Sequence, residues 1–207
     1  MFELDETQRM VESAARSWCE TELAPALPEL ESGEILPYEL LRRLGADLGV
    51  SEILTAMAEQ RLKRLRGDAA KPERSETGGT STGLGGDPML TSVLLKEISR
   101  VSPGVGMVLI SSLGCGMTIL ERGSAEVIER YAVPIFRQEK VGAWALTEPS
   151  AGSDAFGGMR TAAVADGDAF VLNGQKTFIS NAPYADIFAI YARVRSGDGP
   201  GPARAFV

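Results

Sequence analysis

The sequence contains no histidine and only two cysteines among its 207 residues. Without histidine, the chain itself cannot carry out histidine-based acid–base or triad catalysis. Cys19 and Cys115 are far apart in the sequence and form no cluster with the spacing of metal ligands. We therefore expect no metal site, and we expect both cysteines to be small buried hydrophobic residues.

Positive charge is also in deficit, because 21 Lys and Arg residues stand against 28 Asp and Glu residues. The net charge is −7 and the isoelectric point is about 4.8. Such an acidic balance argues against nucleic acid as the main partner. It remains compatible with an anionic ligand such as coenzyme A, which needs only a local basic patch.

Long hydrophobic runs are missing as well. The longest, residues 104–120, is interrupted by Ser111, Ser112 and several glycines, which makes it short and weak for a membrane span. The acidic start, Met1 to Asp5, does not have the character of a secretory signal. We expect a soluble cytoplasmic protein without a membrane span.

The first two thirds of the chain have helical periodicity. Asp5 is a candidate N-cap with Gln8 in capping-box position, and the helix that follows should stop near Pro25. We predict an all-α domain over residues 1–138, with a mobile, Gly- and Ser-rich loop over 67–88. Its further helices are predicted over Pro37–Leu48, over Glu52–Leu65 with Ser51 as a cap, over Pro88–Val101, over Val105–Leu120, and after Ser124 until Pro134 kinks or ends the last one.

Residues 139–207 have β character. A strand at Val141–Thr147 is followed by a meander of three runs, with turn signals at Asp166-Gly167 and Asn173-Gly174. We predict an α+β fold in which the all-α domain is followed by a truncated antiparallel β-barrel-like domain. The three meander runs are Thr161–Ala165, Ala169–Leu172 and Lys176–Ser180, and later strands are expected over Ile187–Val194 and Ala203–Val207.

The loop Glu148–Gly158 combines small and hydroxyl-bearing residues. Pro149 fixes one backbone dihedral, and Gly152 permits close approach of another group. Thr147, Ser150 and other hydroxyls can donate or accept hydrogen bonds. Two interpretations stand at this point: a site for a planar ligand rich in heteroatoms, or a surface loop of polar turn residues.

Two ordered motifs decide between these interpretations. The segment Ala145–Gly157, ALTEPSAGSDAFG, closely resembles the flavin-loop motif of the acyl-CoA dehydrogenase family. About thirty residues on, Asn173–Asn181, NGQKTFISN, resembles the second flavin-contacting segment of that family. The run Leu120–Pro134 is also similar to the family pattern before the flavin loop, so the resemblance covers most of the chain from Pro88 onward.

The resemblance implies a chemistry as well as a fold. The family removes two hydrogens from the α and β carbons of an acyl-CoA thioester. A carboxylate base takes the α proton, and the β hydrogen leaves as hydride to the flavin of FAD. It implies acyl-CoA as the substrate, an electron-transfer flavoprotein or similar acceptor as partner, a homo-oligomer in the complete form, and a place in fatty acid metabolism.

The resemblance also assigns cofactor-binding roles in the first motif. Thr147 would offer its hydroxyl to the N5/O4 edge of the flavin, and Trp144 and Leu146 would frame the ring system from the same strand. Gly152 would leave room for close approach of the loop. Ser153 would reach either the FAD phosphate or the acyl-CoA substrate.

In the second motif, Phe178, Ile179 and Ser180 would approach the flavin ring and the ribityl or phosphate portion of FAD. The alternative for the apolar residues of the two motifs is ordinary sheet core. Glu148 and Asp154 are not expected to be a catalytic carboxylate pair. We expect them to fix the loop, with Asp154 accepting bonds from backbone N–H groups.

The resemblance also indicates what these 207 residues lack. In the family, the catalytic glutamate usually lies in a third, helical domain after the β domain, so no catalytic residue is assigned. The chain is expected to be a truncated and inactive form of an FAD-dependent acyl-CoA dehydrogenase. The alternatives are a non-catalytic subunit that binds FAD, acyl-CoA or a partner, and another flavoenzyme such as an acyl-CoA oxidase.

Overall fold

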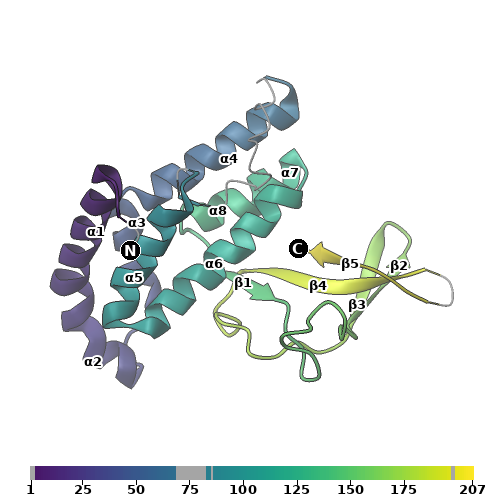
Figure 1. The fold of residues 1–207 in the computed structure, drawn as a ribbon. Coiled ribbons are helices and arrows are strands. Elements are labelled where there is room, and N and C mark those ends of the chain that lie inside the picture. Colours follow the sequence, from purple (N-terminus) through teal and green to yellow (C-terminus); the bar gives the residue numbers. More distant parts are fainter. Residues whose placement is uncertain (1–2, 69–82, 85, 197–198) are drawn as a thin grey trace.

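The computed structural model describes residues 3–68, 83–84, 86–196 and 199–207. Helices occupy the chain as far as Phe136, and the first strand begins at Gly142 (Figure 1). The predicted α+β class is therefore confirmed, with a helical part followed by a β part. Most of the predicted mobile loop 67–88 lies outside the described residues.

The helical part consists of α-helices joined in two places by a π-helical turn. The elements are α1 (Glu6–Trp18), the π turn η1 (Cys19–Leu23), α2 (Ala24–Ser32), α3 (Tyr38–Asp47), α4 (Val50–Arg66), α5 (Pro88–Val101), α6 (Pro103–Arg122), α7 (Ala125–Val127), the π turn η2 (Ile128–Ala132) and α8 (Val133–Phe136).

The predicted start of the first helix is confirmed, but its predicted end is wrong. The Asp5 carboxylate accepts a bond from the backbone N–H of Gln8 at 2.8 Å, and the Gln8 side chain accepts one from the Asp5 N–H at 3.1 Å. The helical path does not stop near Pro25, because it passes through η1 into α2. Pro25 lies in the first turn of α2, where the missing proline N–H costs least.

The other helices agree with the sequence pattern except at two boundaries. Ser51 is not the cap of α4, because the helix already begins at Val50 after Gly49, whose φ of 67° suits glycine. Of the two alternatives expected at Pro134, a kink or a helix end, the end is wrong, because η2 leads into α8 and places Pro134 in the first turn of α8. A π turn therefore precedes each proline at which a helix was expected to stop or kink, η1 before Pro25 and η2 before Pro134.

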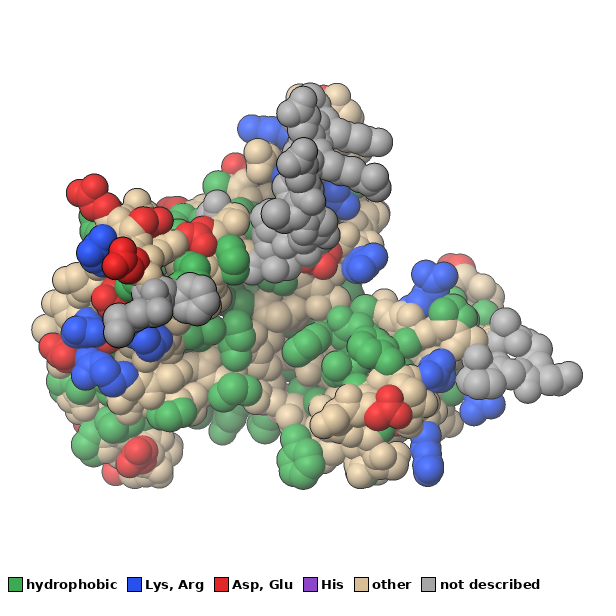
Figure 2. All heavy atoms as spheres, in the orientation of Figure 1, with side chains coloured by type: hydrophobic (Ala, Val, Ile, Leu, Met, Phe, Trp, Pro, Cys, Tyr) green, Lys and Arg blue, Asp and Glu red, His purple; other side chains and the backbone are tan. Residues whose placement is uncertain are grey.

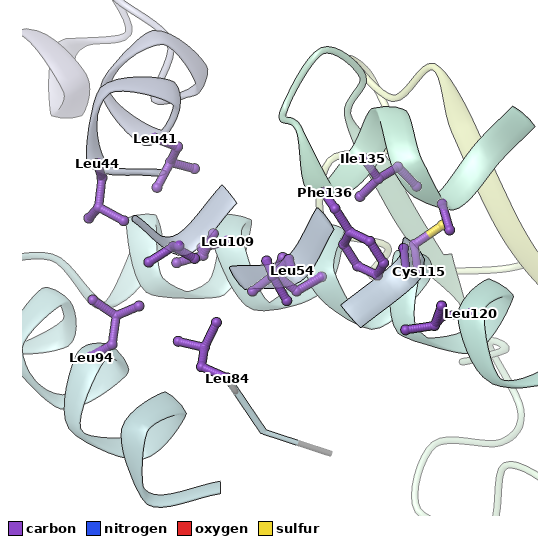
Figure 3. Close-up of a cluster of buried hydrophobic side chains, with 14 of the residues drawn as sticks. Leu41, Leu44, Leu54, Leu84, Leu94, Leu109, Cys115, Leu120, Ile135 and Phe136 are labelled. Atoms are coloured by element: carbon purple, nitrogen blue, oxygen red, sulfur yellow. The ribbon is translucent and has the colours of Figure 1, made fainter. Parts of the chain in front are cut away.

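Helix α6 lies between the other helices and the sheet (Figure 1). In the core shown in Figure 3, Cys115 of α6 packs near Ile135 and Phe136 of α8. Cys19 and Cys115 are both fully buried and unbridged, as predicted. By length and composition alone α6 could cross a membrane, but half of its most apolar window is buried inside the structure.

The sheet is mixed and open. Its strands are β1 (Gly142–Ala145), β2 (Ala162–Asp166), β3 (Ala169–Asn173), β4 (Ile187–Ser196) and β5 (Gly199–Phe206). The order is β1-β4-β2-β3, with β5 also paired to β4. Strand β4 runs parallel to β1 and β2 and antiparallel to β5, whereas β2 and β3 form an antiparallel hairpin. The antiparallel pairs and the open edge agree with the predicted truncated, barrel-like domain, and the parallel neighbours of the long strand β4 are a feature that the prediction did not include.

The predicted meander is only partly present. The β2–β3 hairpin forms, with Asp166 opposite Ala169 and Gly167 at φ 63°, so its turn lies one residue later than expected. The third run, Lys176–Ser180, is not a strand, and that prediction is wrong. Its backbone cannot stay extended because Phe178 has a φ of 55°, in the left-handed region.

Candidate functional site

The two predicted motifs lie side by side in the structure. The backbone N–H of Thr177 donates to the carbonyl oxygen of Thr147 at 3.0 Å. The ammonium of Lys176 donates to the carbonyl oxygen of Leu146 at 3.0 Å. The second segment begins beside the end of β1, at Leu146, and runs back to Asn181, whose side-chain amide donates to Gly142 at the start of β1. The fold therefore joins two segments that are thirty residues apart in sequence.

Glu148 is buried at the centre of this junction. Its carboxylate accepts bonds from the backbone N–H groups of Arg160 at 2.7 Å and Thr161 at 2.9 Å, and from the Lys176 ammonium at 2.8 Å. Burial alone would raise the pKa of Glu148, but these hydrogen bonds outweigh it and lower the pKa to about 2. Glu148 is therefore a fixed anion that holds the loop, as predicted, and is unsuited to be a proton acceptor.

The far end of the first loop is fixed by other contacts. Asp154 accepts a bond from the backbone N–H of Gly157 at 3.0 Å, which confirms its predicted role. A Cβ at position 157 would lie 2.3 Å from an Asp154 carboxylate oxygen, so glycine lets this carboxylate approach the turn closely. The guanidinium of Arg193 in β4 donates to the carbonyl oxygen of Phe156 and, at 3.1 Å, to that of Gly201. The loop is thus tied to the sheet at both ends.

The second segment is anchored to the helical part through Asn181. Its buried side-chain amide donates to the carbonyl oxygens of Val108 in α6 and Gly142 in β1, both at 3.0 Å. The hydroxyl of Tyr38 in α3 donates to its amide oxygen at 3.4 Å. Asn181 has a φ of 69°, a conformation that asparagine tolerates better than most residues. The segment is therefore held at both ends, by Lys176 and by Asn181.

Phe178 stands between these two anchors. Its side chain is 91% exposed, and its backbone has a left-handed φ of 55°. A phenylalanine in this conformation is strained, and such strain persists only where the surrounding structure imposes it. The alternative interpretation of Phe178 as sheet core is wrong, because a large aromatic ring is presented to solvent by a constrained segment.

Trp144 lies on the face of the sheet that is turned toward α6. A Cβ on Gly114 of α6 would lie 3.7 Å from the Trp144 ring. Trp144 is 42% exposed and makes an edge contact with Tyr191 of β4, with ring centroids 6.2 Å apart. Tyr191 makes a similar contact with Phe156, at 6.0 Å. A row of aromatic rings therefore runs from β1 across β4 to the first loop.

The remaining predicted residues occupy the same two segments. Leu146, Thr147, Ile179 and Ser180 are half-buried, and Gly152 and Ser153 are exposed. A Cβ at Gly152 would meet open space, so no protein atom requires glycine there. The assignment of all these residues to FAD, and of Ser153 also to the acyl-CoA, stays a prediction.

The sequence reasoning missed the residues that hold the site together. They are Lys176, Asn181, Tyr191 and Arg193. For Lys176 the sequence did contain a signal. Glu148 follows an apolar strand, and a carboxylate that is buried there needs a cation or several hydrogen-bond donors. Asn181 and Arg193 bind distant backbone carbonyl groups and Tyr191 contacts distant aromatic rings, and no local pattern predicts such contacts.

An apolar cavity of about 110 Å³ has Gly114 in its lining. Hydrophobic side chains from α4, α6 and the segment before α5 form most of its wall, and Thr91 of α5 adds a hydroxyl. In the described part of the chain its lining is Leu54, Gly83, Leu84, Thr91, Ile110, Leu113, Gly114 and Met117. The space-filling view also shows a hollow between the helices and the sheet, with hydrophobic side chains gathered on the sheet beside it (Figure 2).

Comparisons with known proteins agree with the motifs. The family model described as acyl-CoA dehydrogenase, middle domain, matches residues 143–207. The chain is 32% identical over its whole length to a short-chain specific acyl-CoA dehydrogenase of Clostridium acetobutylicum, of which it covers 48%. Over 98% of its length it is 37% identical to the caffeyl-CoA reductase-Etf complex subunit CarC of Acetobacterium woodii, of which it also covers 48%.

A solved structure leads to the same family. A glutaryl-CoA dehydrogenase from Mycobacterium smegmatis in complex with FADH2 matches with a TM-score of 0.71 and 25% identity, over 98% of this chain and 45% of that chain. The resemblance to the acyl-CoA dehydrogenase family is thus confirmed in sequence and in fold. The chain spans about half the length of the relatives it matches.

Proposed function

We propose, from this confirmed resemblance to the acyl-CoA dehydrogenase family, that the protein is an FAD-dependent oxidoreductase that introduces a double bond between the α and β carbons of an acyl-CoA thioester. The observation that carries the proposal is the junction of the two motifs, where Thr177 bonds to Thr147 at 3.0 Å and Phe178 stands exposed between two anchors. An enzyme of this class needs a rigid platform for a flat, polar ring system.

The residues at the junction fit FAD in type and exposure. Phe178 offers an open aromatic face, and Thr147 offers a hydroxyl that stays half-exposed. Trp144 and Leu146 would frame the ring system, with Ile179 and Ser180 beside it, and the exposed Ser153 and Gly152 would meet the phosphate portion or the substrate. FAD, when bound, supplies the acceptor for the electrons removed from the substrate. The protein residues provide orientation and hydrogen bonds.

The apolar cavity beside Gly114 supports an acyl substrate. Its wall is mostly hydrocarbon, and Gly114, which is part of that wall, also lies close to the Trp144 ring. Glu148 is not proposed as the base that takes the α proton, because its pKa of about 2 makes it a poor proton acceptor at neutral pH.

The proposal extends to partners and location. The similarity to a subunit of a caffeyl-CoA reductase-Etf complex supports an electron-transfer flavoprotein or similar acceptor as partner. We also propose a homo-oligomeric cytoplasmic protein of fatty acid metabolism that has no nucleic-acid partner and no membrane span. The burial of half of the most apolar window of α6 supports the last point.

The test is an anaerobic titration of the protein at its natural length. It is purified, saturated with FAD and mixed with a panel of acyl-CoA thioesters while the flavin absorption is followed. Bleaching of the flavin together with formation of 2-enoyl-CoA supports the proposal. Bound FAD without bleaching favours a non-catalytic binding subunit, rapid reoxidation by oxygen with peroxide formation favours an oxidase, and a protein that holds no FAD contradicts the proposal.

A further inference from the structure

Lys176 lies largely, but not fully, buried within the junction of the two motifs. Its side chain is 11% exposed and that of its partner Glu148 is 3% exposed. The ammonium lies 2.8 Å from a Glu148 carboxylate oxygen and 3.0 Å from the carbonyl oxygen of Leu146. A buried ion pair is costly unless further hydrogen bonds satisfy both ions. Here Glu148 gains them from the N–H groups of Arg160 and Thr161.

These bonds fix three separate parts of the chain around one point. Leu146 and Glu148 belong to the first motif, Arg160 and Thr161 follow the loop, and Lys176 begins the second motif. A pair of hydrophobic side chains of the same volume could fill the space, but it would not bind these backbone groups. The ion pair therefore sets the register between the segments, which is the best-supported use of buried charges.

Thr147 lies between the two groups that the Lys176 ammonium binds. The ammonium binds the backbone carbonyl of Leu146 before Thr147 and the side-chain carboxylate of Glu148 after it, so it links the residues on both sides of Thr147. The backbone N–H of Thr177 then holds the carbonyl of Thr147 itself. The direction of the Thr147 hydroxyl depends on this arrangement, although Lys176 itself points to groups of the protein.

We propose that Lys176 is a positioning residue of the FAD site, which holds Thr147 in the orientation that meets the flavin. The inference rests on the proposed function, and it adds a residue for which no direct contact with FAD is needed. Lys176 acts through the first motif. Its removal should therefore change how FAD is held, beyond any effect on the folding of the apoprotein.

The test compares Lys176→Met with Lys140→Met in the protein at its natural length. Lys140 forms an ion pair with Asp186 at a similar distance, 3.0 Å, but these side chains are 51% and 37% exposed. The measurements are the dissociation constant of FAD, the visible spectrum of the bound flavin and the melting temperature of the apoprotein. We expect Lys176→Met to weaken FAD binding about tenfold or more and to shift the flavin bands, as loss of a residue that orients direct ligands does. We expect Lys140→Met to stay within about twofold of the unaltered protein.

A second variant decides the question if Lys176→Met does not fold. Lys176→Arg keeps the positive charge, but a planar guanidinium cannot bind the Leu146 carbonyl and the Glu148 carboxylate in the same geometry. It should fold, bind FAD less tightly than the unaltered protein and show shifted flavin bands. Unchanged affinity and spectrum in a folded Lys176 variant would overturn the inference. Failure of the unaltered protein to bind FAD would instead contradict the proposed function.

Discussion

The backbone N–H of Thr177 donates to the carbonyl oxygen of Thr147 at 3.0 Å, and this bond joins the two motifs of the site. The bond uses main-chain atoms only, so the Thr147 side chain is left for another role. In the proposed function that role is a hydrogen bond to the flavin edge. The roles of the backbone and of the side chain at position 147 can therefore be separated by mutation.

Thr147→Ala should alter the flavin spectrum without unfolding the protein. The substitution removes a half-buried hydroxyl and keeps the main-chain bond to Thr177, so we expect a loss of unfolding free energy of about 1 kcal/mol or less. The visible spectrum of the FAD-loaded protein and a urea titration measure the two effects. Ser150→Ala, which removes an exposed hydroxyl from the same loop, is the control and should leave the spectrum unchanged. Loss of folding in Thr147→Ala would favour a role in the sheet core.

Phe178→Ala should weaken FAD binding and leave the stability of the protein almost unchanged, whereas a core mutation would reduce stability. Because the ring is 91% exposed, the free energy of unfolding should change by no more than about 0.5 kcal/mol. Loss of the aromatic face should weaken FAD binding about tenfold. Phe170→Ala on the β2–β3 hairpin is the matched control, since that ring is also exposed but contacts Phe206 away from the motifs. Equal FAD affinity in the Phe178 and Phe170 variants would show that Phe178 does not meet the cofactor.

Asn181→Gly should destabilise the protein by about 1–2 kcal/mol, because the carbonyl oxygens of Val108 and Gly142 lose a buried donor. Asn181→Ala should cost about 1 kcal/mol more, because alanine at a φ of 69° is strained where glycine is not. Urea unfolding of both variants separates the hydrogen-bond contribution from the backbone contribution. A glycine variant as stable as the unaltered protein would show that the amide bonds contribute nothing to stability.

The buried carboxylate of Glu97 should make folding sensitive to acid. Two bonds from the Arg16 guanidinium, both 3.0 Å long, are the main cause that lowers the pKa of Glu97 to about 2; burial opposes them, and Lys96 and Arg100 assist. Since the folded pKa lies below the unfolded value of 4.5, the stabilisation is present above pH 4.5 and is lost as the pH falls toward 2. We expect this contribution to be about 2 kcal/mol, because its three basic partners are about half exposed.

The measurement is urea unfolding of Glu97→Gln and the unaltered protein between pH 7 and pH 3. Glu97→Gln should be less stable at pH 7, and the difference between the two proteins should shrink as the pH falls. A difference that is constant over this range would contradict the assigned ion pair. Glu126→Gln, at the exposed start of α7, is a control for removal of a negative charge and should cost less stability at pH 7 than Glu97→Gln.

The sequence predicted the parts of the fold that depend on local patterns. The capping box of Asp5 and Gln8, the long helix α6 and the β2–β3 hairpin all follow from residues close to one another in the chain. The end of the first helix could not be predicted, because the π turn η1 absorbs the break that Pro25 would otherwise cause. The parallel pairing of β4 with β1 and β2 depends on contacts between distant segments, which local alternation does not record.

The same division applies to the candidate site. The motifs indicated which segments matter, and the loop-fixing roles of Glu148 and Asp154 followed from their chemistry and are confirmed. The segment Lys176–Ser180 was mistaken for a strand because its composition is β-prone. Its actual shape is imposed by Asn181 and Lys176, whose partners lie up to 73 residues away in the sequence. Only the folded chain shows that the segment presents Phe178 to solvent.

The most direct test of the account is a structure of the FAD-loaded protein at its natural length. We predict that the isoalloxazine ring lies against Phe178, with the Thr147 hydroxyl within hydrogen-bond distance of its N5/O4 edge. A flavin bound elsewhere on the chain, with Thr147 and Phe178 free of contact, would contradict the account.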